Sequence, residues 1–118
     1  MNIIEFYNKV GGNYDEVKSR LMTDERIIKF VRKFPDSGDY EALRSALNEK
    51  NWNDAFRYSH NLKGMCLNLS LTALFEVSSA LCENLRDGSP KQDCEPMMAA
   101  VDVKYAELMS AIAGLSAE

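Results

Sequence analysis

The chain has 118 residues, of which 46% are hydrophobic and 27% charged, as expected for one ordinary globular domain. Eighteen acidic residues outnumber fourteen basic ones and give a formal net charge of −4. That balance argues against a nucleic-acid-binding protein, which needs a basic face. The six glycines and three prolines are too few for a disordered or many-turned all-β chain.

The first third of the chain predicts three short helices. Asn2 and Asn13 each stand three positions before an acidic residue, which is the pattern of a helix N-cap. Thr23 is the expected cap of the third helix, and residues 36–39 predict a turn after it. Apolar side chains recur at helical spacing in that third helix: Ile27, Phe30, Val31 and Phe34.

Four longer helices are predicted next, over about residues 40–47, 54–69 and 71–87 and in the C-terminal segment. The last two carry apolar seams with alternating spacings of three and four residues, as in coiled coils. The connections are short, and no linker divides the chain. The sequence therefore predicts an all-α fold, an antiparallel up-down four-helix bundle with additional short N-terminal helices.

The ends of two helices depend on single residues. Asn53 is the expected cap of the helix that begins at Asp54. Residues 89–92, Ser-Pro-Lys-Gln, have the form of a capping box with proline at the first helical position. Pro96 leaves two alternatives for the last helix, which either bends at the proline or begins there.

No apolar run approaches the ~20 residues of a membrane span, and residues 1–5 have no signal-peptide character. Three cysteines, Cys66, Cys82 and Cys94, are an odd number in apolar, helix-like segments, which favours a reduced, cytoplasmic protein. With a single histidine and no cysteine pair at zinc-finger spacing, we expect no metal site.

The helix at residues 54–69 has two different faces. His60 falls opposite its apolar stripe when the helix is wound at ~100° per residue, so we expect it to face solvent. Phe56, Gly64 and Leu67 share the side of His60, and Lys63 follows it by one turn. The apolar stripe on the other side consists of Ala55, Tyr58, Ser59, Leu62, Met65, Cys66 and Leu69.

These residue types favour a phosphoryl acceptor at a docking surface. A neutral imidazole such as that of His60 can act as a nucleophile, and Lys63 supplies a cation for an anionic group attached to it. Gly64 costs the helix about 1 kcal/mol relative to alanine, and its missing side chain leaves room for a partner. The expected docking surface comprises Gly64, Phe56, Leu67, Arg57, Asn61 and Asn68.

Residues 59–70, SHNLKGMCLNLS, resemble the signature of the histidine-containing phosphotransfer (HPt) domains of bacterial two-component phosphorelays. The resemblance extends over about residues 24–115, so that residues 1–22 form an N-terminal helical extension of a single domain spanning residues 1–118. Ser70 stands where the family usually has glycine, and we expect it to cap the next helix. Cys82 stands where glutamate is common.

The resemblance implies a phosphorelay intermediate. Such domains accept a phosphoryl group from the aspartate of one receiver domain and pass it to another, with no nucleotide site of their own. His60 matches the phosphorylated histidine and is expected to react through Nε2, Lys63 matches the phosphoryl-stabilising lysine, and Gly64 matches the glycine that admits the receiver. No cofactor is implied for this chain, because the receiver holds the Mg²⁺ of such transfers.

The implied partners are response-regulator receiver domains and a sensor (hybrid) histidine kinase, with neither nucleic acid nor membrane, and we expect a monomer. An initiating Met1 and a capped first helix favour a free-standing protein over a domain cut from a hybrid kinase.

Three other functions are alternatives to the phosphorelay intermediate. They are a helical adaptor that docks receivers or other signalling domains without accepting phosphate, an enzyme that autophosphorylates from ATP, and a purely structural bundle. The absence of a glycine-rich nucleotide loop from the sequence argues against the enzyme.

Overall fold

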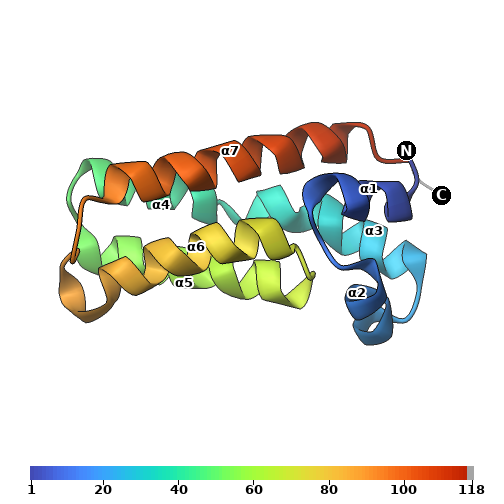
Figure 1. Cartoon of the computed structure of the whole chain (residues 1–118), viewed down its shortest axis with the longest axis horizontal. Helices are drawn as coiled ribbons and strands as arrows, with labels where there is room; N and C mark the ends of the chain where they lie inside the picture. Colours follow the sequence, from blue (N-terminus) through green and yellow to red (C-terminus); the bar gives the residue numbers. More distant parts are fainter. Residues whose placement is uncertain (117–118) are drawn as a thin grey trace.

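The structure, a computed structural model, describes residues 1–116. Over these residues every regular element is a helix, so the predicted all-α class is confirmed. The elements are α1 (Ile3–Val10), α2 (Tyr14–Leu21), α3 (Asp24–Lys33), the 3₁₀ helix η1 (Phe34–Ser37), α4 (Asp39–Asn48), α5 (Trp52–Asn68), α6 (Thr72–Leu85), the 3₁₀ turn η2 (Arg86–Gly88) and α7 (Cys94–Ala113) (Figure 1).

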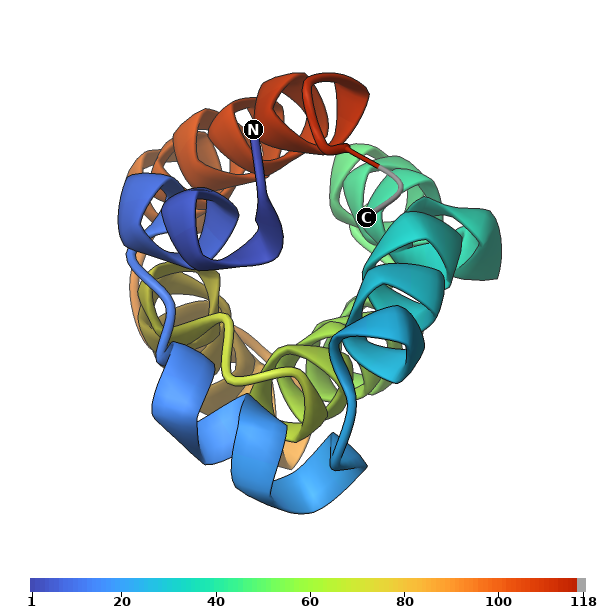
Figure 2. The same cartoon turned by 90° about the vertical axis from the view of Figure 1, so that its right-hand side faces the viewer.

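Helices α4, α5, α6 and α7 form the predicted four-helix bundle. α5 packs against both α4 and α6, and α6 packs against α7. α4 closes the ring on α7, where Tyr40 stacks on Tyr105 with ring centroids 3.8 Å apart and donates its hydroxyl hydrogen to Asp102 at 2.6 Å. Viewed end on, the helices surround a common core (Figure 2).

The N-terminal helices cover one end of this bundle. α1 packs against α7, α2 packs against α3, and α3, η1 and α4 follow one another along α7 (Figure 1). The predicted caps are confirmed, because the side-chain oxygens of Asn2, Asn13 and Thr23 each accept the N–H group three residues on. The Met1 ammonium donates to the Gly114 carbonyl at 2.7 Å, which ties the first residue to the C-terminal end of α7.

α5 begins earlier than the sequence predicted. Asn51, not Asn53, is its N-cap, and the Asn51 side chain accepts the Asp54 N–H at 3.3 Å. Asn53 lies within the first turn of the helix. The error arose because two asparagines flank Trp52, and only the backbone geometry decides which of them stands outside the helix.

The start of α7 also differs from the prediction. Residues 89–92 form no capping box, because α7 begins at Cys94 with Asp93 as its cap. The Asn84 side-chain oxygen instead accepts two backbone N–H groups of this connection. Pro96 is the third residue of α7, a position where a backbone N–H has no intrahelical partner. The helix therefore neither bends at Pro96 nor begins there.

The apolar stripe of α3 is centred differently from the prediction. Phe30 is 43% exposed, whereas the neighbouring Ile28 is buried with Ile27, Val31 and Phe34. Phe30 lies about 90° around the helix from the centre of these four side chains. It therefore contributes to the surface of the molecule.

The three cysteines are free and buried. Burial raises the pKa of the Cys66 thiol to about 12, so this cysteine is an inert core residue.

Among residues 1–116, no helix is long and apolar enough to cross a lipid bilayer. Over the same described range, no three histidine, cysteine or acidic side chains gather in a group that could hold a metal ion.

Candidate functional site

α5 presents His60 to solvent because its opposite face is held in the core. The predicted core positions Ala55, Ser59, Leu62 and Cys66 are fully buried, and His60 is exposed, as its angular position predicted. The remaining predicted stripe residue of this end of the helix, Tyr58, is half-buried. The buried Ser59 hydroxyl is satisfied within the helix, because it donates to the Phe56 carbonyl at 2.8 Å.

His60 lines a shallow hollow at the surface. The other residues of this hollow are Phe56, Arg57, Asn61 and Arg86. The Phe56 ring is half-buried, and its centroid lies 6.0 Å from that of the imidazole. The Arg86 guanidinium carbon stands 5.3 Å from the centroid of the same phenyl ring. Two guanidinium groups and an aromatic ring thus surround the histidine.

Arg86 was not among the site residues predicted from the sequence. It lies at the end of α6, in η2, and its Nε donates to the Glu83 carboxylate at 3.1 Å. No short motif links it to His60. The available signal was topological: α5 and α6 are antiparallel about the turn at Ser70, and Arg86 follows that turn by about as many residues as Phe56 precedes it.

Lys63 and Gly64 lie one turn beyond His60 on the same helix. Lys63 is half-buried, and no salt bridge within residues 1–116 involves it. Apart from its chain neighbours and the backbone of its own helix, a β-carbon built on Gly64 would meet no atom within 4 Å. Packing inside this chain therefore does not require glycine there, and the space beside His60 is open to a partner.

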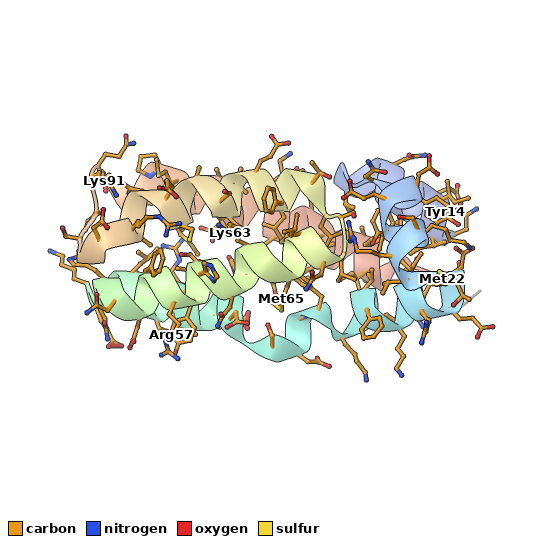
Figure 3. The ribbon with its side chains drawn as sticks, turned by 90° about the horizontal axis from the view of Figure 1, so that it is seen from below. Tyr14, Met22, Arg57, Lys63, Met65 and Lys91 are labelled. Carbon is orange, nitrogen blue, oxygen red and sulfur yellow. The ribbon has the colours of Figure 1, made fainter. Side chains whose placement is uncertain are left out.

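The other predicted docking residues fall into two groups. Arg57 and Asn61 line the hollow beside His60, where Asn61 Nδ2 donates to Asp39 Oδ1 at 3.3 Å and so reaches the start of α4. Leu67, 54% exposed, and Asn68 lie in the last turn of α5, outside the hollow. In Figure 3, Arg57 projects toward α4 and Lys63 toward α6, on the two flanks of α5.

The charged groups that line the hollow are two arginines, each paired with a carboxylate outside it, Arg57 with Asp54 and Arg86 with Glu83. The hydrogen bond from Arg57 to Asp54 holds the pKa of the guanidinium above its usual value, so Arg57 remains charged. Arg57 also lies over the Tyr58 ring, 4.6 Å from its centroid, which fixes the direction of the side chain. The hollow has cationic and amide groups and no carboxylate among its lining residues. This donor set fits a phosphoryl group better than a metal ion.

The turn after α5 corrects one prediction. Ser70 does not cap α6 through its side chain, because Leu71 is the N-cap residue and no side-chain cap hydrogen bond is formed. Ser70 has φ 53°, in the left-handed region that favours glycine, which explains why a glycine suits this position. Its hydroxyl donates to Glu16 at 2.7 Å and accepts from Arg20 at 2.8 Å. The Leu71 N–H donates to the Cys66 carbonyl at 2.9 Å, which is the hydrogen bond that closes a helix around a left-handed residue.

Comparison with known proteins shows to which family this chain belongs. Residues 37–117 match the model of the Hpt domain family. No curated protein and no solved structure matches the chain significantly. The family match spans more than half of the chain and includes α5 with its exposed histidine. The chain therefore belongs to the Hpt domain family, whose members act in histidine phosphotransfer in phosphorelays.

Proposed function

We propose that His60 accepts a phosphoryl group from the aspartyl phosphate of a receiver domain and passes it to the aspartate of a second receiver. The observation that carries this proposal is the placement of the only histidine. His60 is exposed on the face of α5 opposite the core, in a hollow lined by two arginines. A histidine that served only to pack the core would be buried, whereas His60 is exposed.

The transfer needs no proton movement in the attack itself. The lone pair of His60 Nε2 forms the N–P bond, while the proton on Nδ1 stays in place. The P–O bond to the receiver's aspartate breaks, and the carboxylate leaves with the bonding electrons. In the second transfer, a carboxylate oxygen of the other receiver attacks phosphorus, and the ring nitrogen leaves with the N–P electron pair. The Mg²⁺ of both steps is supplied by the receivers.

Two cations support the phosphoryl group in this proposal. Lys63 follows His60 by one turn on the α6 flank and has no carboxylate to neutralise it within the described residues. Arg86 is bound to the exposed Glu83, a pairing weak enough to be exchanged for a phosphoryl oxygen. Phe56, beneath Arg86, keeps the guanidinium at the rim of the hollow.

The proposal also covers the source of the phosphoryl group, the cellular location and the oligomeric state. The donor receiver is charged by a sensor histidine kinase, which fits the family's role in phosphorelays. The protein acts in the cytoplasm, which fits its three free thiols. It acts as a monomer, because the apolar stripes of its helices are buried within one chain.

The experiment mixes the purified chain with receiver domains that carry a radiolabelled aspartyl phosphate. We expect acid-labile label to move to the chain and then to a second receiver. His60→Gln is the control and should receive no label. Receiver binding without label transfer to the wild-type chain would support the adaptor function instead.

A further inference from the structure

A groove in the surface lies where α2, α3 and the C-terminal end of α5 meet, beyond the hollow that contains His60. Its volume is about 490 Å³, within the range of ~300–1,000 Å³ of pockets that hold small molecules. In Figure 3, Met65 lies on the flank of α5 that faces α3 and α4. Most of the lining is apolar: the buried Phe34 and Leu69, the half-buried Leu21 and Met65, and the Phe30 ring, which is 43% exposed. The groove thus presents apolar surface to solvent.

The polar groups that line the groove are cationic or neutral. They are Arg20, Lys33 and Asn68, and no carboxylate is among the lining residues. Arg20 is already engaged, because its guanidinium donates to Glu16 and to the Asn68 carbonyl. Lys33 is exposed, and no salt bridge within residues 1–116 involves it. Its ammonium is therefore the cation that an anionic group in the groove would find without a partner.

The neighbours of Lys33 on α3 strengthen this positive charge. Lys29 precedes Lys33 by four residues, and Arg26 precedes Phe30 by four. The three exposed cations and the phenyl ring therefore share one face of the helix. On a chain with a net charge of −4, this face would attract an anion from solution.

We propose that the groove binds a single-chain anionic amphiphile, an aliphatic or aryl carboxylate whose apolar body lies on Phe30 and Met65 and whose carboxylate is bound by Lys33. Such a molecule has the two features that the lining calls for, an apolar body and one negative charge. Five of the eight lining residues precede residue 37, where the family match begins, so the site belongs largely to the N-terminal helices. It is separate from His60 and adds a small-molecule ligand to the proposed phosphotransfer function.

The test uses two fluorescent probes with the same aromatic body. Anilinonaphthalene sulfonate carries one negative charge, and phenylnaphthylamine is neutral. Each is titrated with the full chain and with two variants, Lys33→Gln and Phe30→Ala. The matched controls are Lys9→Gln, at an exposed lysine of α1, and Val103→Ala, at an apolar side chain of α7 that is 56% exposed.

We expect Lys33→Gln to raise the Kd of the sulfonate about tenfold, the loss expected for one charge-assisted hydrogen bond. The Kd of the neutral probe should stay the same in this variant, which also shows that the groove is intact. Phe30→Ala should raise both Kd values severalfold, because it removes apolar contact surface. Both controls should match the wild-type chain.

Two further measurements test the place and the ligand. With isotopically labelled methionine methyl groups, the NMR resonance of Met65, assigned from Met65→Leu, should shift when the sulfonate binds. The resonance of Met109 on α7 should not shift. Decanoate should displace the sulfonate, whereas decyltrimethylammonium, with the same chain length and the opposite charge, should not.

Three results would overturn the inference, and none of them bears on phosphoryl acceptance by His60. A sulfonate Kd that is the same in Lys33→Gln and the wild-type chain would exclude the lysine as the anion's partner. An unshifted Met65 resonance would place the probe outside the groove. Sedimentation of the chain with anionic phospholipid vesicles, without displacement of the sulfonate by decanoate, would assign the basic face to a membrane instead of a free amphiphile.

Discussion

The two ends of α5 are built differently. At the C-terminal end, backbone carbonyls are bound by side chains of the N-terminal helices: the Tyr7 hydroxyl donates to Leu69 O at 2.7 Å, and Arg20 donates to Leu67 O at 3.2 Å. Around His60 in the other half, the arginines are paired only at the surface: Arg86 binds the exposed Glu83, and Arg57 binds the half-buried Asp54. One end of the helix is anchored, and the other is open.

This difference is what a transfer site requires. A cation already held in a buried network could not turn to a phosphoryl group without loss, whereas an exposed ion pair contributes little and is readily exchanged. Substitutions at the open end should change phosphoryl transfer, and substitutions at the anchored end should change stability.

The largest effect is expected at the open end. His60→Gln should abolish phosphoryl acceptance, because glutamine has no nucleophilic ring nitrogen. The free energy of unfolding should change by less than ~0.5 kcal/mol, since the side chain is exposed. Label transfer and urea unfolding measure the two quantities. A labelled variant would place the phosphoryl group on another residue.

Gly64→Gln should be almost as damaging to transfer. The added side chain occupies the open space beside His60, so we expect the transfer rate to fall well over tenfold. The variant should fold as well as the wild-type chain or better, because glutamine favours the helix more than glycine does. Ala106→Gln, at an exposed position of α7, is the matched control and should transfer normally. A stable and fully active Gly64→Gln chain would remove this glycine from the interface.

Arg86→Gln should reduce transfer about tenfold, the loss expected for one hydrogen bond to a charged group. The phosphorylated chain should also lose its label faster, because one cation no longer faces the phosphoryl oxygens. Arg32→Gln, at an arginine outside the hollow, should change neither rate. Equal lifetimes of the phosphorylated state in Arg86→Gln and the wild-type chain would show that Arg86 only covers Phe56.

The anchored end should affect stability instead of transfer. Tyr7→Phe removes a buried hydrogen bond to the Leu69 carbonyl and leaves that carbonyl without this donor. We expect the free energy of unfolding to fall by about 1–2 kcal/mol, and Tm to fall by several degrees. Phosphorylation by phosphoramidate should stay at the wild-type rate. A chain that kept its stability but lost phosphoryl acceptance would reverse the roles of the two ends.

The smallest effect concerns alkaline pH and the contact between α4 and α7. Burial, together with the hydrogen bond to Asp102, raises the pKa of Tyr40 from 10.0 to about 12. Between these values the unfolded chain loses the phenolic proton and the folded chain keeps it, so the free energy of unfolding falls as pH rises from 10 to 12. Urea unfolding at several pH values should show a shallower decline in Tyr40→Phe. Parallel declines would mean that Tyr40 ionises equally in both states.

Local patterns were sufficient for the parts of this protein that depend on neighbours in the chain. Apolar spacing predicted the bundle helices, and winding α5 predicted that His60 is exposed and Leu62 buried. Caps at Asn2 and Thr23 were predicted because a side chain and an N–H three residues apart suffice to form them. The site motif around His60 lies within a few turns of one helix and was therefore visible in the sequence.

Contacts between helices were decided by the tertiary structure alone. Arg86 reaches the His60 hollow only because α6 folds back on α5, and the hydroxyl of Ser70 finds its partners Arg20 and Glu16 only because α2 packs there. Phe30 is exposed although its helical spacing matches the apolar stripe of α3. Packing against the other helices decides which side of that stripe is buried. Helical periodicity specifies which side chains share a face of one helix, whereas the neighbour of that face depends on how all the helices pack together.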